Sequence, residues 1–241
     1  MRQTLKASKQ VGIFALALGV IALSATVAQA ETGAYWEVGS TKIEGSSELL
    51  PKLNLKKDTS NIVLLFTIAK SKIDLECTEI KMVNGLLHKS GKTTGKLDFG
   101  NCITKFNGAE ALCKPHSPGA AVGLIETNAL IGLLKLHKES EIKEDLLELF
   151  PAEGETFATL VLGPTGKECL FLLDENAIKG RLFFRDSQKE LLVNKIEHLF
   201  EEQKALSKLV ILGSAPVTMD GSFLAFLVGS HEGLKWSGHT A

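Results

Sequence analysis

Short apolar stretches that follow a glycine recur along the chain and limit it to a fold built from short strands. Gly95-Lys-Leu-Asp-Phe99, Gly180-Arg-Leu-Phe-Phe184 and Gly221-Ser-Phe-Leu-Ala-Phe226 each place apolar residues at alternate positions after a glycine. Because successive side chains of a strand point to opposite faces, this pattern is typical of a half-buried strand that begins after a turn. The 22 glycines of the chain indicate many such turns.

Further segments carry the apolar content of strands, and Gly163-Pro-Thr-Gly166 is a turn signal that predicts a hairpin between FATLVL and ECLFLL. Regular short strands separated by turn residues predict a mainly β fold, an antiparallel sandwich or barrel-like single domain with at most one or two short helices. The segments expected to form strands are 61–69, 73–80, 119–127, 130–137, 157–163, 168–173, 177–184 and 222–228.

Two segments fit this interpretation less well. Residues 140–150 and 188–210 are rich in helix-forming residues, and Leu192, Ile196 and Leu199 fall at helical spacing. The second segment is open to two interpretations, an amphipathic surface helix or a hairpin that turns near Glu201–Gln203.

The first thirty residues have the three parts of a secretory signal. Arg2, Lys6 and Lys9 precede an apolar core, and Ala28-Gln29-Ala30 supplies small residues for cleavage before Glu31. The apolar run is also about long enough to act as an uncleaved membrane anchor. We expect residues 1–30 to be removed and residues 31–241 to form a secreted β-rich domain, extracellular or associated with the cell envelope, with membrane contact only through the signal before cleavage.

The charge of the expected mature chain argues against nucleic acid as a partner. The signal carries three of the 27 basic residues and none of the 28 acidic ones, so the remainder has a net charge of −4. No basic block supplies the electrostatic footprint that nucleic-acid binding requires.

Four cysteines, an even number, predict two disulfides in an exported protein. A zinc site is not expected, because no closely spaced Cys-x-x-Cys pair occurs. Three pairings are possible for Cys77, Cys102, Cys113 and Cys169. The preferred pairing is Cys102–Cys113 with Cys77–Cys169, in which the first bridge closes a short loop and the second joins distant strands.

Residues Gly85–Thr93 resemble a phosphate-binding loop, but the spacing is wrong. Five residues separate Gly85 from Gly91, where the loop needs four. The segment also leads into an alternating, strand-like stretch rather than into a helix that could face the phosphate. A polar hairpin loop is the better interpretation, so no nucleotide is expected.

No catalytic or metal-binding motif stands out elsewhere. The chain lacks Gly-x-Ser-x-Gly and His-Glu-x-x-His, and its six histidines are scattered. His116 and Asp98 lie beside expected strands or turns, where polar residues are common. Sequence alone cannot pair the acidic residues for hydrolysis. We therefore expect no cofactor and no metal, and we favour a non-enzyme over an enzyme.

Two tryptophans near the ends of the expected mature chain are the candidate ligand contacts. Trp36 follows the cleavage site closely, and Trp236 lies just before the C-terminus. On an exposed sheet they could stack on sugar rings or hold a partner. The favoured interpretation is that they fill the core where the terminal strands meet.

A set of loose motifs resembles a known family. These are Ala34-Tyr-Trp36, Glu76-Cys-Thr78, Gly95-Lys-Leu-Asp-Phe-Gly-Asn-Cys102, Cys113, Ile125-Glu-Thr-Asn128, the segment 149–157, Cys169 and Lys235-Trp-Ser237. Together they resemble a family of uncharacterised secreted, four-cysteine, β-rich proteins of soil actinobacteria. The resemblance implies an extracellular, β-rich, disulfide-bonded protein and no particular activity. It also implies paired strands before the final glycine-rich strands, which favours the hairpin for 188–210.

The sequence thus predicts a secreted, non-catalytic binding or structural module of the envelope or cell exterior. Its ligand is unknown, and a cell-wall polymer or another protein is the expected partner. The alternative is a secreted hydrolase that uses an unrecognised carboxylate or His–carboxylate site.

Overall fold

The computed structural model describes residues 33–44, 50–139, 142–164, 173–186 and 192–240. Among these residues the only helical element is a single 3₁₀ turn, η1 (Gly229–His231), and every other element is a strand. No helix in the described part of the chain is long and apolar enough to cross a membrane. The prediction of a mainly β, antiparallel, barrel-like fold is confirmed.

Eight strands close into an antiparallel barrel. The ring runs β3-β6-β7-β12-β13-β15-β16-β19 and returns to β3. Its members are β3 (Lys52–Lys57), β6 (Glu79–Leu87), β7 (Lys92–Gly100), β12 (Leu130–Glu139), β13 (Ile142–Pro151), β15 (Leu173–Asp186), β16 (Glu197–Glu202) and β19 (Ser222–Val228).

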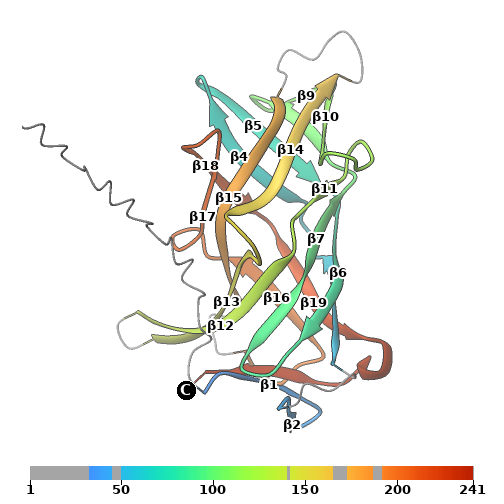
Figure 1. The fold of residues 1–241 in the computed structure, drawn as a ribbon, viewed down its shortest axis with the longest axis vertical. Coiled ribbons are helices and arrows are strands. Elements are labelled where there is room, and N and C mark those ends of the chain that lie inside the picture. The colour runs from blue at the N-terminus through green and yellow to red at the C-terminus, as the bar shows by residue number, and fades with distance from the viewer. Residues whose placement is uncertain (1–32, 45–49, 140–141, 165–172, 187–191, 241) are drawn as a thin grey trace, which may run out of the picture.

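A second antiparallel sheet continues from this barrel. Its order is β9-β8-β5-β4-β18-β17-β15-β14-β10. Figure 1 shows the closed barrel and the second sheet one above the other along the long axis, with the long strand β15 contributing to both. The strands that are new here are β4 (Ile62–Ile68), β5 (Ser71–Cys77), β8 (Ile103–Phe106), β9 (Ala109–Ala111), β10 (Cys113–His116), β14 (Thr156–Pro164), β17 (Lys208–Ile211) and β18 (Ala215–Asp220).

A three-stranded sheet lies across the far end of the closed barrel (Figure 1). It consists of β2 (Thr41–Lys42), β1 (Tyr35–Val38) and β20 (Trp236–His239). The remaining short strand, β11 (Ile125–Glu126), pairs with β7.

Alternation in the sequence explains why these segments form a barrel. In β19, Phe223, Ala225 and Leu227 are buried while the residues between them are partly exposed. Most of the buried hydrophobic side chains of the described residues form one continuous cluster. Burial of this apolar surface is the main favourable contribution to folding.

The strands bend where the barrel meets the second sheet. At Gly180 in β15, φ is +123° and an added Cβ would lie 1.8 Å from the carbonyl oxygen of Lys208. At Gly221, between β18 and β19, φ is +107° and the Cβ would lie 2.6 Å from the carbonyl oxygen of Asn61. Only glycine combines this backbone conformation with such close approach. The glycine of the recurring sequence motif therefore marks a bend at these two positions.

The two segments with helical character form strands. Residues of 140–150 from Ile142 onward lie in β13, and 188–210 contains β16 and most of β17. A helix is therefore wrong for the described part of 188–210. The predicted hairpin is correct in having two strands. Its turn is misplaced, because Glu201 and Glu202 belong to β16, and its pairing is wrong, because both arms pair with β15 rather than with each other. Tertiary pairing overrides helix propensity here.

The other strand predictions hold with three exceptions. The predicted strand 73–80 is divided at Thr78 between the end of β5 and the start of β6. Only Ile125–Glu126 is a strand within 119–127, and most of the predicted strand 168–173 lies outside the described residues. The Gly85–Thr93 segment forms the closed end of the β6–β7 hairpin, as expected, with residues 88–91 as the loop and the flanking residues in the two strands.

The preferred disulfide pairing is wrong. Cys77 is bonded to Cys102, which excludes both preferred bridges. Cys77 ends β5 and Cys102 precedes β8, and the pairing of those strands, with Glu76 opposite Ile103, brings the two Cα atoms to 4.0 Å. Strand register, not loop length, therefore decides the partner. Cys113 is also disulfide-bonded, and Cys169 lies outside the described residues.

Candidate functional site

Three strand breaks meet where the closed barrel joins the second sheet. They are residues 58–61 between β3 and β4, residues 203–207 between β16 and β17, and Gly221 between β18 and β19. We call this level the waist. Because the ladders are interrupted here, backbone and side-chain polar groups are free to form a site.

A pocket of about 310 Å³ lies at the waist. Ligand pockets usually measure about 300–1,000 Å³, so this pocket suits a small group. Its charged lining residues are Arg185, Glu201, Glu202, Lys204 and Asp220, with Ser60 and Ser222 as polar neighbours.

Most of the charges in this waist pocket are already paired. Lys204 Nζ lies 3.1 Å from Asp220 Oδ1. Arg185 lies 3.9 Å from Glu201 Oε2 and 3.7 Å from Glu144 Oε1, the latter supplied by β13. Asp58, just behind the pocket, accepts a hydrogen bond from the Ser222 hydroxyl.

Glu202 is the exception among the lining acids. It is 9% exposed, and no cation of the described residues lies within ion-pair distance of it. Its Oε2 accepts a hydrogen bond of 3.0 Å from the backbone N–H of Met219. Its Oε1 is buried and has no hydrogen-bond partner.

The surroundings of Glu202 change its acidity. Burial raises the pKa of this carboxyl to about 7, although the Ser207 hydroxyl, the Met219 N–H and the charge of Lys204 lower it. A buried carboxyl disfavours its charged form because the interior solvates the charge poorly. Near neutral pH the group is therefore divided between its protonated and ionised forms.

Arg185 supplies a second unsatisfied polar group at the same pocket. Its Nε is buried and lacks a hydrogen-bond partner. Buried donors and acceptors without partners are uncommon in proteins. An orphan acceptor on Glu202 and an orphan donor on Arg185 make the waist pocket the candidate site.

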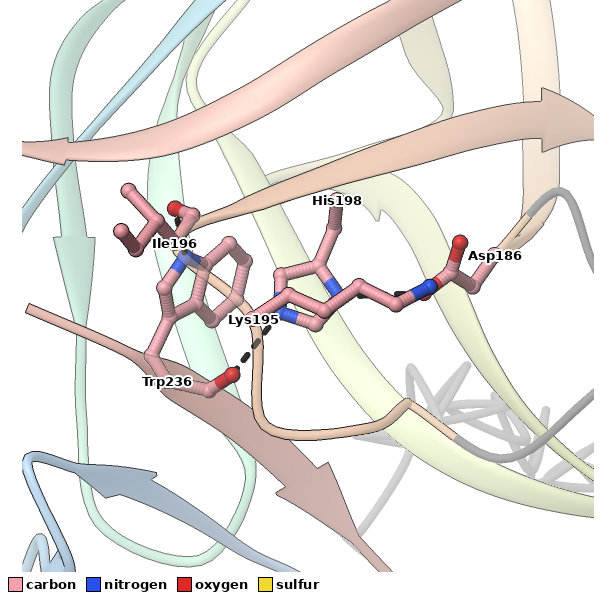
Figure 2. Close-up of polar contacts among 5 residues, drawn as sticks. All are labelled: Asp186, Lys195, Ile196, His198 and Trp236. Atoms are coloured by element: carbon pink, nitrogen blue, oxygen red, sulfur yellow. Dashed lines mark hydrogen bonds and ion pairs between the residues drawn. The ribbon is translucent and has the colours of Figure 1, made fainter.

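A His–carboxylate pair occurs elsewhere, inside the closed barrel (Figure 2). His198 Nδ1 lies 3.1 Å from Asp186 Oδ2, and His198 Nε2 lies 2.8 Å from the carbonyl oxygen of Trp236. Lys195 Nζ approaches the same Asp186 oxygen at 3.3 Å. His198 and Asp186 are 0% and 1% exposed.

This pair has a structural role. Burial alone would raise the pKa of Asp186, but the hydrogen bond and charge of His198 and the charge of Lys195 lower it below its ordinary value. Both ring nitrogens of His198 are engaged, Nε2 with the carbonyl oxygen of Trp236 and Nδ1 with the Asp186 carboxyl. With both nitrogens engaged, the ring cannot act as a base on a substrate.

The two tryptophans are not ligand contacts in this structure. Trp36 and Trp236 are each 1% exposed, and their ring centroids lie 5.6 Å apart at the covered end of the barrel. Trp36 Nε1 donates to the carbonyl of Lys92, and Trp236 Nε1 donates to that of Ile196. The candidate contact role is therefore wrong, because neither ring can reach a ligand. The favoured interpretation, a core filled where the terminal strands meet, is confirmed.

The other residues weighed from the sequence do not converge. Burial, together with the neighbouring charge of Glu126, raises the pKa of Asp98, but Asp98 lies opposite Glu126 on β7 and β11 and lines a pocket separate from that of Glu202. His116 lies on β10, in the second sheet. Within the described residues no group of three or more His, Cys, Asp or Glu side chains could hold a metal ion.

No protein-family model, no curated protein and no solved structure matches the chain.

Proposed function

We propose that this protein is an exported, non-catalytic binding module of the cell envelope or cell exterior, and that its ligand contacts the waist pocket. The observation that carries the proposal is the Glu202 carboxyl, buried beside a pocket with one oxygen unpaired. A buried polar atom without a partner is destabilising by about 1–3 kcal/mol. Because the atom lies beside a pocket, we infer that a bound ligand supplies its missing partner.

The chemistry of the described residues supports binding over catalysis. A hydrolase with two carboxylates needs a second group that is free to act as a nucleophile or base. At the waist the other acids are engaged, Asp220 with Lys204 and Glu201 with Arg185. The His198–Asp186 pair is sealed in the barrel.

Export is supported by the cysteines. Cys77–Cys102 is a disulfide, and Cys113 is also disulfide-bonded. Disulfides persist in oxidising compartments. Together with the signal-like N-terminus, this favours a location outside the cytoplasm.

Sedimentation tests the proposal. Purified protein is mixed with cell walls of the producing organism and with common insoluble polysaccharides, and the pellet is assayed. We expect pelleting that survives moderate salt and weakens in Glu202→Gln. Protein that remains in the supernatant with every polymer would rule out polymer binding and leave a soluble partner as the ligand.

A hydrolase remains the second candidate, on one specific observation. A carboxyl with a pKa of about 7 is suited to general acid catalysis near neutral pH. A screen with chromogenic glycosides and esters decides between the two. Turnover that is abolished in Glu202→Gln would establish the enzyme, and no turnover by protein that pellets with a polymer would support the binding module.

A further inference from the structure

Two residues that line the waist pocket each have a polar atom without a hydrogen-bond partner, and one atom is an acceptor while the other is a donor. Glu202 Oε1 can accept a hydrogen bond, and Arg185 Nε–H can donate one. Both atoms are buried, so bulk water does not satisfy them, and a ligand reaches them only when the Glu202 and Arg185 side chains turn toward the pocket that these residues line. A ligand that carries both a donor and an acceptor would then supply the missing partners.

The charge of the pocket selects the kind of donor. Two basic and three acidic side chains line it, and Glu144 adds a further carboxylate behind Arg185. Because the basic side chains already face Asp220, Glu201 and Glu144, the charge left without a partner is that of Glu202. An ammonium group makes a charge-assisted hydrogen bond to a carboxylate, about twice as strong as a neutral one. An anionic ligand would meet an excess of negative charge.

We infer that the waist pocket binds a small hydroxylated amine, of which an amino sugar is the simplest example. Its protonated amino group lies against the Glu202 carboxylate, and a neighbouring hydroxyl oxygen accepts the Nε–H of Arg185. The inference rests on the proposed function as a binding module and names the ligand class of that site.

The size of the pocket agrees with such a ligand. A water molecule occupies about 30 Å³ of the liquid, so the 310 Å³ of the pocket corresponds to the space of about ten waters. This leaves room for a single sugar ring or the end of a chain. Ser60 and Ser222 on the pocket wall offer further hydroxyl groups to a polar ligand.

Binding of a cation is expected to be coupled to proton release. The groups that face Glu202 are Lys204, Asp220, the Ser207 hydroxyl and the Met219 N–H, and its pKa among them is about 7. A bound ammonium group favours the ionised carboxylate, so the ligand displaces the proton. Below neutral pH the affinity should fall by up to about tenfold per pH unit, because ever less of the carboxyl is ionised.

Titration calorimetry tests the inference with three matched sugars, glucosamine, N-acetylglucosamine and glucose. At pH 7 we expect glucosamine to bind at least ten times more tightly than the other two, which lack the charged amine. The titrations are repeated in two buffers with different ionisation enthalpies. A difference in the observed binding enthalpy between the buffers should show that the wild-type protein releases protons when glucosamine binds.

Two variants assign the effect to the site. Glu202→Gln should weaken glucosamine binding at least tenfold and abolish proton release. Glu197→Gln, the same charge change on an exposed side chain of the same strand outside the pocket, should alter affinity by less than about threefold. Equal binding of glucosamine and N-acetylglucosamine, no binding of glucosamine, or full affinity in folded Glu202→Gln would each overturn the inference.

The sedimentation assay separates this inference from the proposed function. In one outcome, the protein pellets with a polymer although glucosamine neither binds in solution nor reduces the pelleting. That result would support the binding module and rule out an amine as its ligand. Loss of both pelleting and sugar binding would reject both proposals.

Discussion

Glu202 and Met219 are joined across the waist by a hydrogen bond of 3.0 Å from the backbone N–H of Met219 to the Glu202 carboxyl. The β17–β18 ladder ends on that side with the pair Leu209 and Val217, so the N–H of Met219 has no ladder partner in β17. The carboxyl of Glu202 replaces that partner. This one contact places a buried acid at the edge of the waist pocket.

The stability of the protein should depend on pH through Glu202. Its folded pKa, about 7, is raised from the model-compound value of 4.5. The folded state therefore holds a proton that the unfolded state loses between pH 4.5 and 7, and stability falls as pH rises through that window. The loss is at most on the order of 3 kcal/mol once pH exceeds 7.

Urea denaturation at pH 4.5 and pH 8 measures this effect. Glu202→Gln should be more stable than the wild type at pH 8 by about 2–3 kcal/mol and little different at pH 4.5. The control Glu201→Gln should stay within about 0.5 kcal/mol at both values. An equal effect of Glu202→Gln at the two pH values would argue against a buried, titrating carboxyl.

Truncation of a buried tryptophan should destabilise the barrel without a direct effect on binding. Trp36→Ala removes a fully buried indole, and such changes cost about 3–5 kcal/mol in the free energy of unfolding. Trp36→Phe keeps most of the ring while it loses the hydrogen bond to Lys92. A folded Trp36→Phe protein that no longer pellets with polymer would restore the ligand-contact role.

Removal of the Cys77–Cys102 disulfide should lower stability by about 3.5 kcal/mol, from the chain entropy of a closure of this length. The bridge spans a sequence separation of 25 residues. Denaturant unfolding of the double variant Cys77→Ser, Cys102→Ser measures the loss. Non-reducing peptide mapping should recover Cys77 linked to Cys102, and a Cys102–Cys113 peptide would contradict the structure.

Two glycine substitutions separate backbone strain from steric overlap. Gly180→Ala places a methyl group 1.8 Å from the Lys208 carbonyl at a φ of +123°, so the strands must shift, and we expect a loss of more than about 3 kcal/mol. Gly213→Ala shares a positive φ, +80°, but meets nothing within 4 Å. It should cost only about 1–2 kcal/mol. Thermal unfolding measures the stability of both variants. Similar losses of stability would show that the steric contact at Gly180 adds little to the strain of its positive φ.

Local pattern predicted the strands because alternation is a property of each segment. The apolar residues of 222–228, for example, alternate between buried and partly exposed positions along β19. Closure of the barrel could not be read in the same way. It depends on pairings between segments far apart in sequence, such as β3 with β19, and these leave no local signature.

The disulfide pairing was predicted wrongly for the same reason, because it depends on pairing between distant segments. Loop length favoured Cys102–Cys113, but the register of β5 with β8 sets Cys77 beside Cys102.

The candidate site was missed for a related reason. Glu202 lies in the run Glu201-Glu202-Gln203-Lys204, which has the composition of a solvent-exposed turn. In the structure it continues a strand in which His198, Phe200 and Glu202 are buried at alternate positions. That period of two was the available signal. Helix-forming residues concealed it, and the partners Met219 and Arg185 come from other strands.

Amide chemical-shift mapping tests most directly the claim that the waist pocket is the binding site. ¹⁵N-labelled protein is titrated with glucosamine at pH 7, and the backbone amide signals are followed. The account predicts saturable shifts that are largest at Met219, Gly221 and Ser222, where the hydrogen bond to Glu202 and the pocket wall lie. Saturable shifts confined to another face, or none at saturating sugar, would contradict it.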